Sequence, residues 1–286
     1  MKYLLSFIIT CIFANQSYTQ IPTEKALLWK ISGKGIKQPS YLYGTIHVMC
    51  PEQIIIDSMI ANAFSNSKQL YLEINLDDPN MMVKAMKTMM MPDSCSLEKL
   101  VGKADYDSMN TIFKNTAGMP LSLMGKAKPM LLMSAVFPAI LKCNPDGFEK
   151  RFQAMAKEKN MDLKGLETIE YQMRVFDTIP FKVQAEMLKN LLYNLDSARL
   201  QFLELAKVYQ SKDVNAMQQL TTKDPEFGKY DVMMLQNRNQ NWIPVIIEEA
   251  KIKPTFFAVG AAHLGGKNGV IYLLRQQGYK VEAVLY

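Results

Sequence analysis

Two short stretches near opposite ends of the chain share one local pattern. In YLYGTIHV (residues 41–48) and FFAVGAAHLGG (residues 256–266), an apolar run ends in a glycine and a histidine follows three residues later. These are the only two histidines among 286 residues. In α/β folds, the turns that follow neighbouring strands meet at one edge of the sheet, where ligands bind. The pattern therefore predicts that both ends of the chain contribute strands to one sheet.

Hydrophobic periodicity extends this prediction to the whole fold. Strand-like runs cover residues 27–31, 40–45, 68–76, 161–168 and 254–260, and a last strand begins at 279. The first two form a hairpin, and residues 80–250 are mainly helical, including a very apolar segment at 128–142 that we expect to be a central helix. We therefore expect an α/β (mixed α+β) fold. A central mixed β-sheet built from N- and C-terminal segments is flanked by helices, with a helical insert at about 80–250.

Residues 1–19 have the layout of a signal peptide. One lysine is followed by an apolar run from Tyr3 to Ala14 and then by short polar residues. This run is too short to span a bilayer, and we expect cleavage before Gln20, which leaves one domain over residues 20–286. No later segment reaches 18 consecutive apolar residues. We expect an exported protein, periplasmic or extracellular, with no transmembrane span in the mature chain.

Export makes disulfides possible. The mature chain keeps Cys50, Cys95 and Cys143, so at most one pair forms within it. Cys95 and Cys143 lie in the loop-like stretches MPDSCS and KCNPDG, which favours a bridge between them. The alternative is three buried or unpaired thiols. The net charge of +6 comes from scattered lysines without a nucleic-acid motif, so we expect no nucleic-acid partner.

His47, His263 and Glu73 are the first candidates for a functional site. A histidine at a strand-end turn ligates a metal or transfers protons, or else it donates to a backbone carbonyl. Glu73 stands in the apolar strand LYLEINL, where a carboxylate is costly unless it is paired, ligates a metal or faces solvent. Two imidazoles and one carboxylate leave open positions on a divalent metal ion, the arrangement that activates water.

Four further residues are candidates around this set. Gly44 and Gly260 end the two strands, where glycine permits a sharp turn or close approach of a ligand. Glu167 in GLET follows a short strand and is a candidate general base or ligand, or else it stabilises a helix N-terminus. Arg238 in LQNRNQNW is a candidate for binding an oxyanion or a substrate carboxylate, or else it forms an ion pair.

Five stretches together resemble the TraB/GumN family: YLYGTIHV, LYLEINL, KGLETIEYQ, LQNRNQNW and FFAVGAAHLGGKNGVIYLLRQQGYKVEAV. The resemblance covers about residues 25–286. It implies a fold similar to the TIKI metalloproteases and, more distantly, to erythromycin esterase and the haem-binding ChaN proteins. It also implies a divalent-metal-dependent peptidase that uses manganese or cobalt rather than zinc and acts on a peptide or protein. The residues that carry the implied site are Gly44, His47, Glu73, Gly260 and His263, with Glu167 and Arg238 in further family motifs.

Two hypotheses follow for the function. In the first, the protein is an exported metal-dependent hydrolase in which His47, Glu73 and His263 bind the ion and Glu167 assists proton transfer. In the second, it binds haem, metal or another ligand without catalysis, as a ChaN-like protein. The carboxylate in an interior strand favours the first, because carboxylates suit hard divalent ions better than haem iron.

Overall fold

The structure is a computed structural model that describes residues 20–285, so the expected signal peptide lies outside the described residues. The sheet has the strand order β4-β3-β5-β2-β1-β6. The strands are β1 (Leu28–Ser32), β2 (Ser40–Thr45), β3 (Gln69–Ile74), β4 (Asp162–Glu167), β5 (Thr255–Gly260) and β6 (Lys280–Ala283). Strands β2 to β5 pair in parallel, whereas β1 runs antiparallel to β2 and β6. The predicted mixed sheet of N- and C-terminal segments is confirmed, and the helical insert adds the edge strand β4.

Helices fill most of the chain between β3 and β5. The α-helices are α1 (Ser58–Ser65), α2 (Met81–Thr88), α3 (Leu97–Val101), α4 (Lys103–Ala117), α5 (Pro129–Ser134), α6 (Phe137–Leu141), α7 (Phe148–Glu158), α8 (Ile169–Phe176), α9 (Phe181–Tyr193), α10 (Leu195–Gln210), α11 (Val214–Thr222), α12 (Asn237–Ile252) and α13 (Val270–Gln276). Short helical turns are η1 (Pro51–Gln53), η2 (Leu121–Leu123), η3 (Gly228–Tyr230), η4 (Val232–Gln236, a π-helical turn) and η5 (Ala261–His263).

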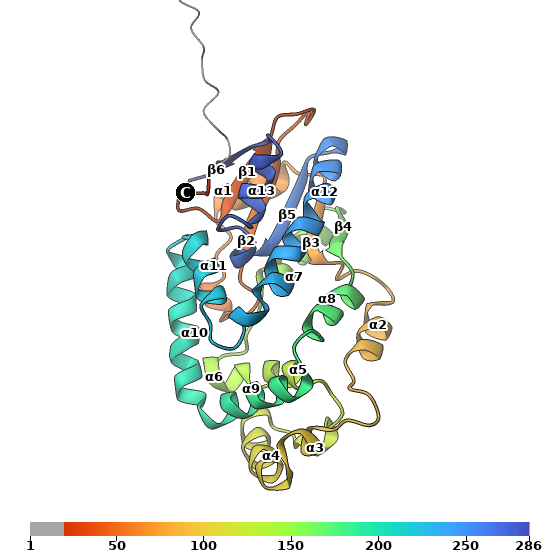
Figure 1. The fold of residues 1–286 in the computed structure, drawn as a ribbon. Coiled ribbons are helices and arrows are strands. Elements are labelled where there is room, and N and C mark those ends of the chain that lie inside the picture. Colours follow the sequence, from red (N-terminus) through yellow and green to blue (C-terminus); the bar gives the residue numbers. More distant parts are fainter. Residues whose placement is uncertain (1–19, 286) are drawn as a thin grey trace, which may run out of the picture.

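Two separate hydrophobic cores stabilise the fold. The first lies around the sheet, where Phe64 of α1 and Phe152 of α7 pack on Phe256 of β5, with ring centroids 5.2 and 4.9 Å from it. Helices α12 and α13 pack together on the other face. The second core lies within the insert, among α3 to α6, α9 and α10. The helices of the insert lie beyond the end of the sheet at which β2, β3 and β5 terminate (Figure 1).

The prediction of one central helix over residues 128–142 is wrong. This segment forms two short helices, α5 and α6, and its buried residues belong to the core of the insert. Pro138 lies in the first turn of α6, where its missing N–H leaves no hydrogen bond unmade, so it begins a new helix. Within residues 20–285, no helix combines the length and apolarity needed to cross a bilayer.

The expected bridge between Cys95 and Cys143 is also wrong. The structure pairs Cys143 with Cys50 and leaves Cys95 as a free thiol. Beside the bridge, Met49 and Asp146 exchange two backbone hydrogen bonds of 2.9 Å. Loop context alone favoured Cys95, but pairing depends on which loops the fold brings together. The disulfide and the two hydrogen bonds fasten the loop after β2 to the start of α7.

Candidate functional site

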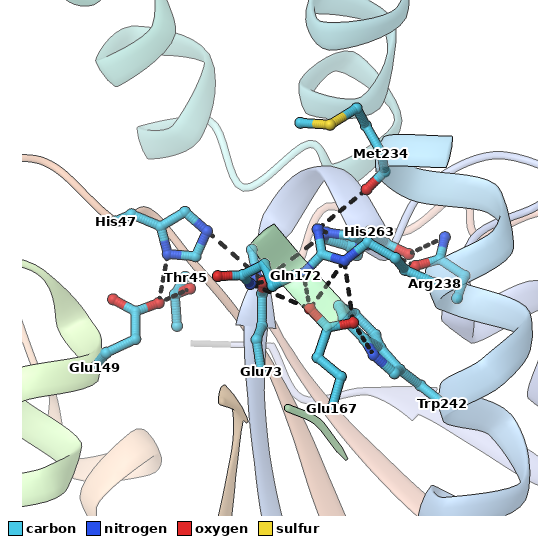
Figure 2. A network of polar contacts seen from close by, with 12 residues as sticks. Thr45, His47, Glu73, Glu149, Glu167, Gln172, Met234, Arg238, Trp242 and His263 are labelled. Carbon is cyan, nitrogen blue, oxygen red and sulfur yellow. Dashed lines mark hydrogen bonds and ion pairs between the residues drawn. The ribbon is translucent and has the colours of Figure 1, made fainter. Parts of the chain in front are cut away.

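The sheet order brings the two Gly-x-x-His turns together, as predicted. Strands β2 and β5 are parallel neighbours with Thr45 opposite Gly260, so both turns leave the sheet at one level. Strand β3 lies on the other side of β5 and adds Glu73. The Nε2 atoms of His47 and His263 lie 3.6 and 3.8 Å from Oε1 of Glu73 (Figure 2). Glu73 is 6% exposed, which excludes a solvent-facing position.

Hydrogen bonds at the far side of each ring determine how the two histidines face Glu73. Nδ1 of His47 lies 2.8 Å from a carboxylate oxygen of Glu149, which can only accept when ionised. Nδ1 of His263 lies 2.6 Å from Oδ1 of Asn239, whose amide nitrogen donates to two backbone carbonyls. In the neutral rings, each Nδ1 therefore carries the hydrogen and each Nε2 carries the lone pair. Such outer partners are typical of histidines that ligate metals.

Gly260 keeps the space between these three donor atoms open. Its backbone N–H donates to Oε1 of Glu73 over 2.8 Å. A Cβ atom at this position would lie 3.1 Å from Nε2 of His47 and 3.4 Å from Oε1 of Glu73. Only a residue without a side chain leaves room there for a ligand.

The donor atoms suit a divalent metal ion, although the site is not preassembled. Among the residues described, no group of three His, Cys, Asp or Glu side chains is arranged so that it could hold a metal ion without rearrangement. Ligands at 2.0–2.2 Å from a tetrahedral ion are separated by about 3.4 Å, close to the two distances from Glu73 of 3.6 and 3.8 Å. Nε2 of His263 also lies 3.2 Å from Nη1 of Arg238. An ion bound to His263 would displace that hydrogen bond.

Arg238 holds the buried side of the cluster. Nη2 donates to Glu73 over 2.5 Å and to Glu167 over 2.7 Å, and Nε donates to Glu167. Nη1 donates to the carbonyl of Met234 and to His263. These contacts occupy all five N–H groups of the guanidinium. Arg238 therefore positions its neighbours, and no donor remains for an oxyanion or a substrate carboxylate in this arrangement.

Glu167 and Gly44 do not reach the cavity that the other candidates share. Both oxygens of Glu167 accept hydrogen bonds, from Arg238, Gln172 and the indole of Trp242. Glu167 is thus placed to hold Arg238 rather than to act as a general base. A Cβ atom at Gly44 would lie 3.1 Å from the Cα atom that begins η5, so this glycine allows β2 and η5 to pack closely.

The charges of the cluster shift the pKa values of its members in opposite directions. Partial desolvation disfavours a charged His47, whose side chain is 55% exposed, but the carboxylates of Glu149 and Glu73 outweigh this effect and raise its pKa to about 9. Burial and Arg238 lower the pKa of His263 to about 3, so this ring is neutral at pH 7. Burial opposes ionisation of Glu73 as well, yet Arg238 and the two imidazoles hold its pKa well below its usual range.

A cavity of about 460 Å³ opens over this cluster. His47, Glu73, Glu149, Arg238 and His263 form its polar floor. The walls come from β3 and from the helices of the insert, and their side chains are mostly apolar: Leu72, Ile74, Leu76, Phe176, Leu205, Met217, Phe227, Met234 and Leu235. A concave apolar site with a few convergent polar groups is the usual form of a small-molecule or peptide site.

Glu149, Gln172 and Asn239 contact the candidate residues but were not singled out from the sequence. Asn239 follows Arg238 directly in NRN, and Gln172 ends the stretch GLETIEYQ, so proximity in sequence was an available signal for both. Glu149 had no such signal. It reaches His47 because the Cys50 disulfide fastens the start of α7 to the loop after β2.

The fold and site define a class of α/β protein in which two strand-end histidines and a strand glutamate converge beside a helical insert. A family model described as the TraB/PrgY/gumN family matches residues 27–283, and the chain belongs to this family. No solved structure matches the chain significantly.

Curated relatives include three metalloproteases. The chain is 24% identical to "Metalloprotease TIKI1" of Danio rerio over 314 residues, which cover 90% of this chain and 63% of that protein. It is 23% identical to "Metalloprotease TIKI2" of Xenopus tropicalis, over 85% of this chain and 57% of that protein. It is also 23% identical to "Metalloprotease TIKI1" of Homo sapiens, over 90% and 61%. The chain thus spans about three fifths of the length of these relatives.

Proposed function

We propose that this protein is an exported, divalent-metal-dependent hydrolase that cleaves a peptide or protein. One observation carries the proposal: Nε2 of His47, Nε2 of His263 and Oε1 of Glu73 converge on one space beside Gly260. The negative charge there is compensated by a proton on His47 and by Arg238, and a divalent ion bound to the three atoms would take the place of that proton. A bound divalent ion would polarise a substrate carbonyl and lower the pKa of a water.

The protein's own residues divide the remaining work. Glu149 and Asn239 fix the hydrogen on the outer nitrogen of each ring, so that Nε2 is the nitrogen that would ligate the ion. Arg238 donates to the second oxygen of Glu73 and to Glu167, and so holds both carboxylates in place below the cavity floor. The apolar walls exclude water from the reacting groups, which strengthens electrostatic interactions there.

Two further findings support the finer parts of the proposal. The curated relatives are named as metalloproteases, which supports a peptide or protein substrate and a metal ion in the site. Manganese or cobalt is the metal that the family resemblance implies. The Cys50–Cys143 disulfide is typical of an oxidising compartment, which supports export.

Metal content is the first test. The chain from Gln20 onward is purified without a histidine tag, incubated with manganese, cobalt or zinc, desalted and analysed by mass spectrometry. We expect near one ion per chain in the wild type and little in His47→Ala and His263→Ala. Glu73→Gln should lose the ion, whereas Glu282→Gln, a partly exposed glutamate on β6, should keep it. Equal retention by wild type and His47→Ala would contradict the proposed site.

Hydrolysis is the second test. The metal-loaded wild type is incubated with a mixture of synthetic peptides, and the products are identified by mass spectrometry. We expect cleavage that a chelator abolishes and that the His263→Ala variant lacks. Chelator-insensitive cleavage would refute metal dependence. Tight haem binding that needs His47, with no cleavage of any peptide, would favour the binding-protein hypothesis instead.

A further inference from the structure

The cavity walls carry apolar side chains that the two hydrophobic cores do not use. Phe176 at the end of α8, Phe227 before η3 and Met234 in η4 are half-buried and line the cavity. The two cores are built from other residues, around the sheet and within the insert. Apolar side chains that remain partly exposed in a concavity mark a binding surface for an apolar group.

These side chains are fixed next to the polar floor. The carbonyl of Met234 accepts a hydrogen bond from Nη1 of Arg238 over 3.0 Å, which ties this wall to the cluster. The backbone N–H of Phe227 donates to the Asp224 carboxylate over 2.7 Å, which holds the turn that carries the ring. Gln172, about one helical turn before the end of α8, donates to both Glu73 and Glu167. An apolar group in the cavity would therefore lie directly beside the reacting groups.

One carboxylate lies on the same apolar wall. Asp231 accepts a hydrogen bond of 2.6 Å from the Gln236 side chain on Oδ2, and its Oδ1 atom has no partner among the described residues. Asp231 also lines the cavity. A negative charge with unfulfilled hydrogen-bonding capacity at this wall repels an acidic ligand, and burial strengthens the repulsion.

We propose that the cavity selects substrates that place a bulky apolar side chain, aromatic or long aliphatic, next to the bond that reacts. Phe176, Phe227 and Met234 contact this side chain, and Asp231 excludes an acidic one. The assignment to a peptide substrate rests on the proposed hydrolase function. The preference of the cavity for apolar ligands does not rest on it, because that preference depends only on the residues of the cavity walls.

Ligand binding to the metal-free protein tests the cavity apart from catalysis. The probes are 4-phenylbutanamide, butanamide and 4-phenylbutanoate, with affinities measured by ligand-observed NMR titration. Burial of a phenyl group should make 4-phenylbutanamide bind roughly tenfold or more tightly than butanamide. The acid should bind more weakly than its amide in the wild type, and Asp231→Asn should reduce that difference. Equal affinities for the two amides would overturn the proposal.

Variants of one wall residue identify the surface. Phe227→Ala should weaken 4-phenylbutanamide severalfold, and Phe227→Trp, which fills the cavity, should weaken it while leaving butanamide unchanged. Leu200 on α10 is 68% exposed, so Leu200→Ala is the matched control. It should change the affinity for neither amide. The midpoint of thermal unfolding is recorded for each variant, and the Trp variant keeps the test valid if the Ala variant unfolds. Equal effects of Phe227→Trp and Leu200→Ala would overturn the assignment.

Peptide cleavage by the metal-loaded protein supplies the last comparison. Products should carry Phe, Tyr, Trp, Leu or Met beside the cleaved bond, and Asp or Glu should be rare there. Cleavage without side-chain preference would refute the cavity proposal and leave the hydrolase standing. Selective binding of 4-phenylbutanamide without any peptide cleavage would support the cavity proposal and contradict the hydrolase function.

Discussion

Replacement of Arg238 by methionine tests whether one buried guanidinium holds the site together. Methionine has a similar length and no charge. The side chains of Arg238, Glu73 and Glu167 are 6, 7 and 4% exposed, so the variant leaves two carboxylates buried without their cation. Removal of one partner from a buried ion pair costs about 3–5 kcal/mol. We expect the free energy of unfolding at pH 7 to fall by about this amount.

The loss should shrink in acid. In the wild type the pKa of Glu73 is well below 4.5, its unfolded value, so this group adds stability above pH 4.5 that fades as pH falls. In Arg238→Met the carboxylate takes up a proton more readily, and the folded state loses less on acidification. At about 1.4 kcal/mol per pH unit below 4.5, the difference between the two proteins should narrow by about 1–2 kcal/mol between pH 7 and pH 3.5.

Urea unfolding followed by tryptophan fluorescence measures both effects. The Trp242 ring centroid lies 4.9 Å from the guanidinium and 4.5 Å from the His263 ring centroid, so it reports on this region. A Trp29→Phe background leaves Trp242 as the only tryptophan. Arg174→Met, an exposed arginine on α8, is the matched control and should change stability by less than about 0.5 kcal/mol. A loss below about 1 kcal/mol for Arg238→Met, or a difference independent of pH, would refute the reasoning.

Four other predictions follow from the same geometry. Gly260→Ala should fold normally but bind metal at least tenfold more weakly by mass spectrometry, because its Cβ enters the ligand space. Gly44→Ala should instead lower the free energy of unfolding in urea by about 1–3 kcal/mol, since its Cβ meets the backbone of η5. Cys143→Ser should lower that free energy by about 2–4 kcal/mol and weaken metal binding, because it frees the loop after His47, whereas Cys95→Ser should do neither. Metal affinity, titrated from pH 6 to pH 9, should rise with pH, because a raised pKa of about 9 lets protons compete for His47; a flat profile would exclude this histidine as a ligand.

The sheet could be predicted because its strands carry strong local signals. The run at Ser40–Thr45 and the buried run at Thr255–Gly260 are apolar, bounded by turn residues and long enough to be read directly. The shared Gly-x-x-His pattern then indicated that they are neighbours. The prediction of one helix over 128–142 was wrong because apolar content does not distinguish one long helix from two short ones. Pro138, in the first turn of α6, separates the two.

The sequence predicted which residues form the site better than it predicted what each of them does there. Arg238 and Glu167 could be singled out as charged residues in unusual contexts, but only tertiary contacts show that Arg238 has every donor occupied. Glu149 and the Cys50–Cys143 pair could not be predicted from the sequence, for the same reason. Both depend on the contact between the loop after β2 and the start of α7, which lies about 100 residues further along the chain. No local pattern encodes a contact at that separation.

Charge explains why the proposed divalent ion would compete with a proton on His47 for one place in this site. Glu73, Glu149 and Glu167 supply three carboxylates, and Arg238 supplies one permanent positive charge. With both imidazoles neutral, the cluster carries a net charge of −2, which burial makes costly. A proton on His47 removes half of this charge, which is why its pKa is raised. A divalent ion would remove all of it, so the cluster is better matched to a doubly charged cation than to the proton that His47 takes up in its place.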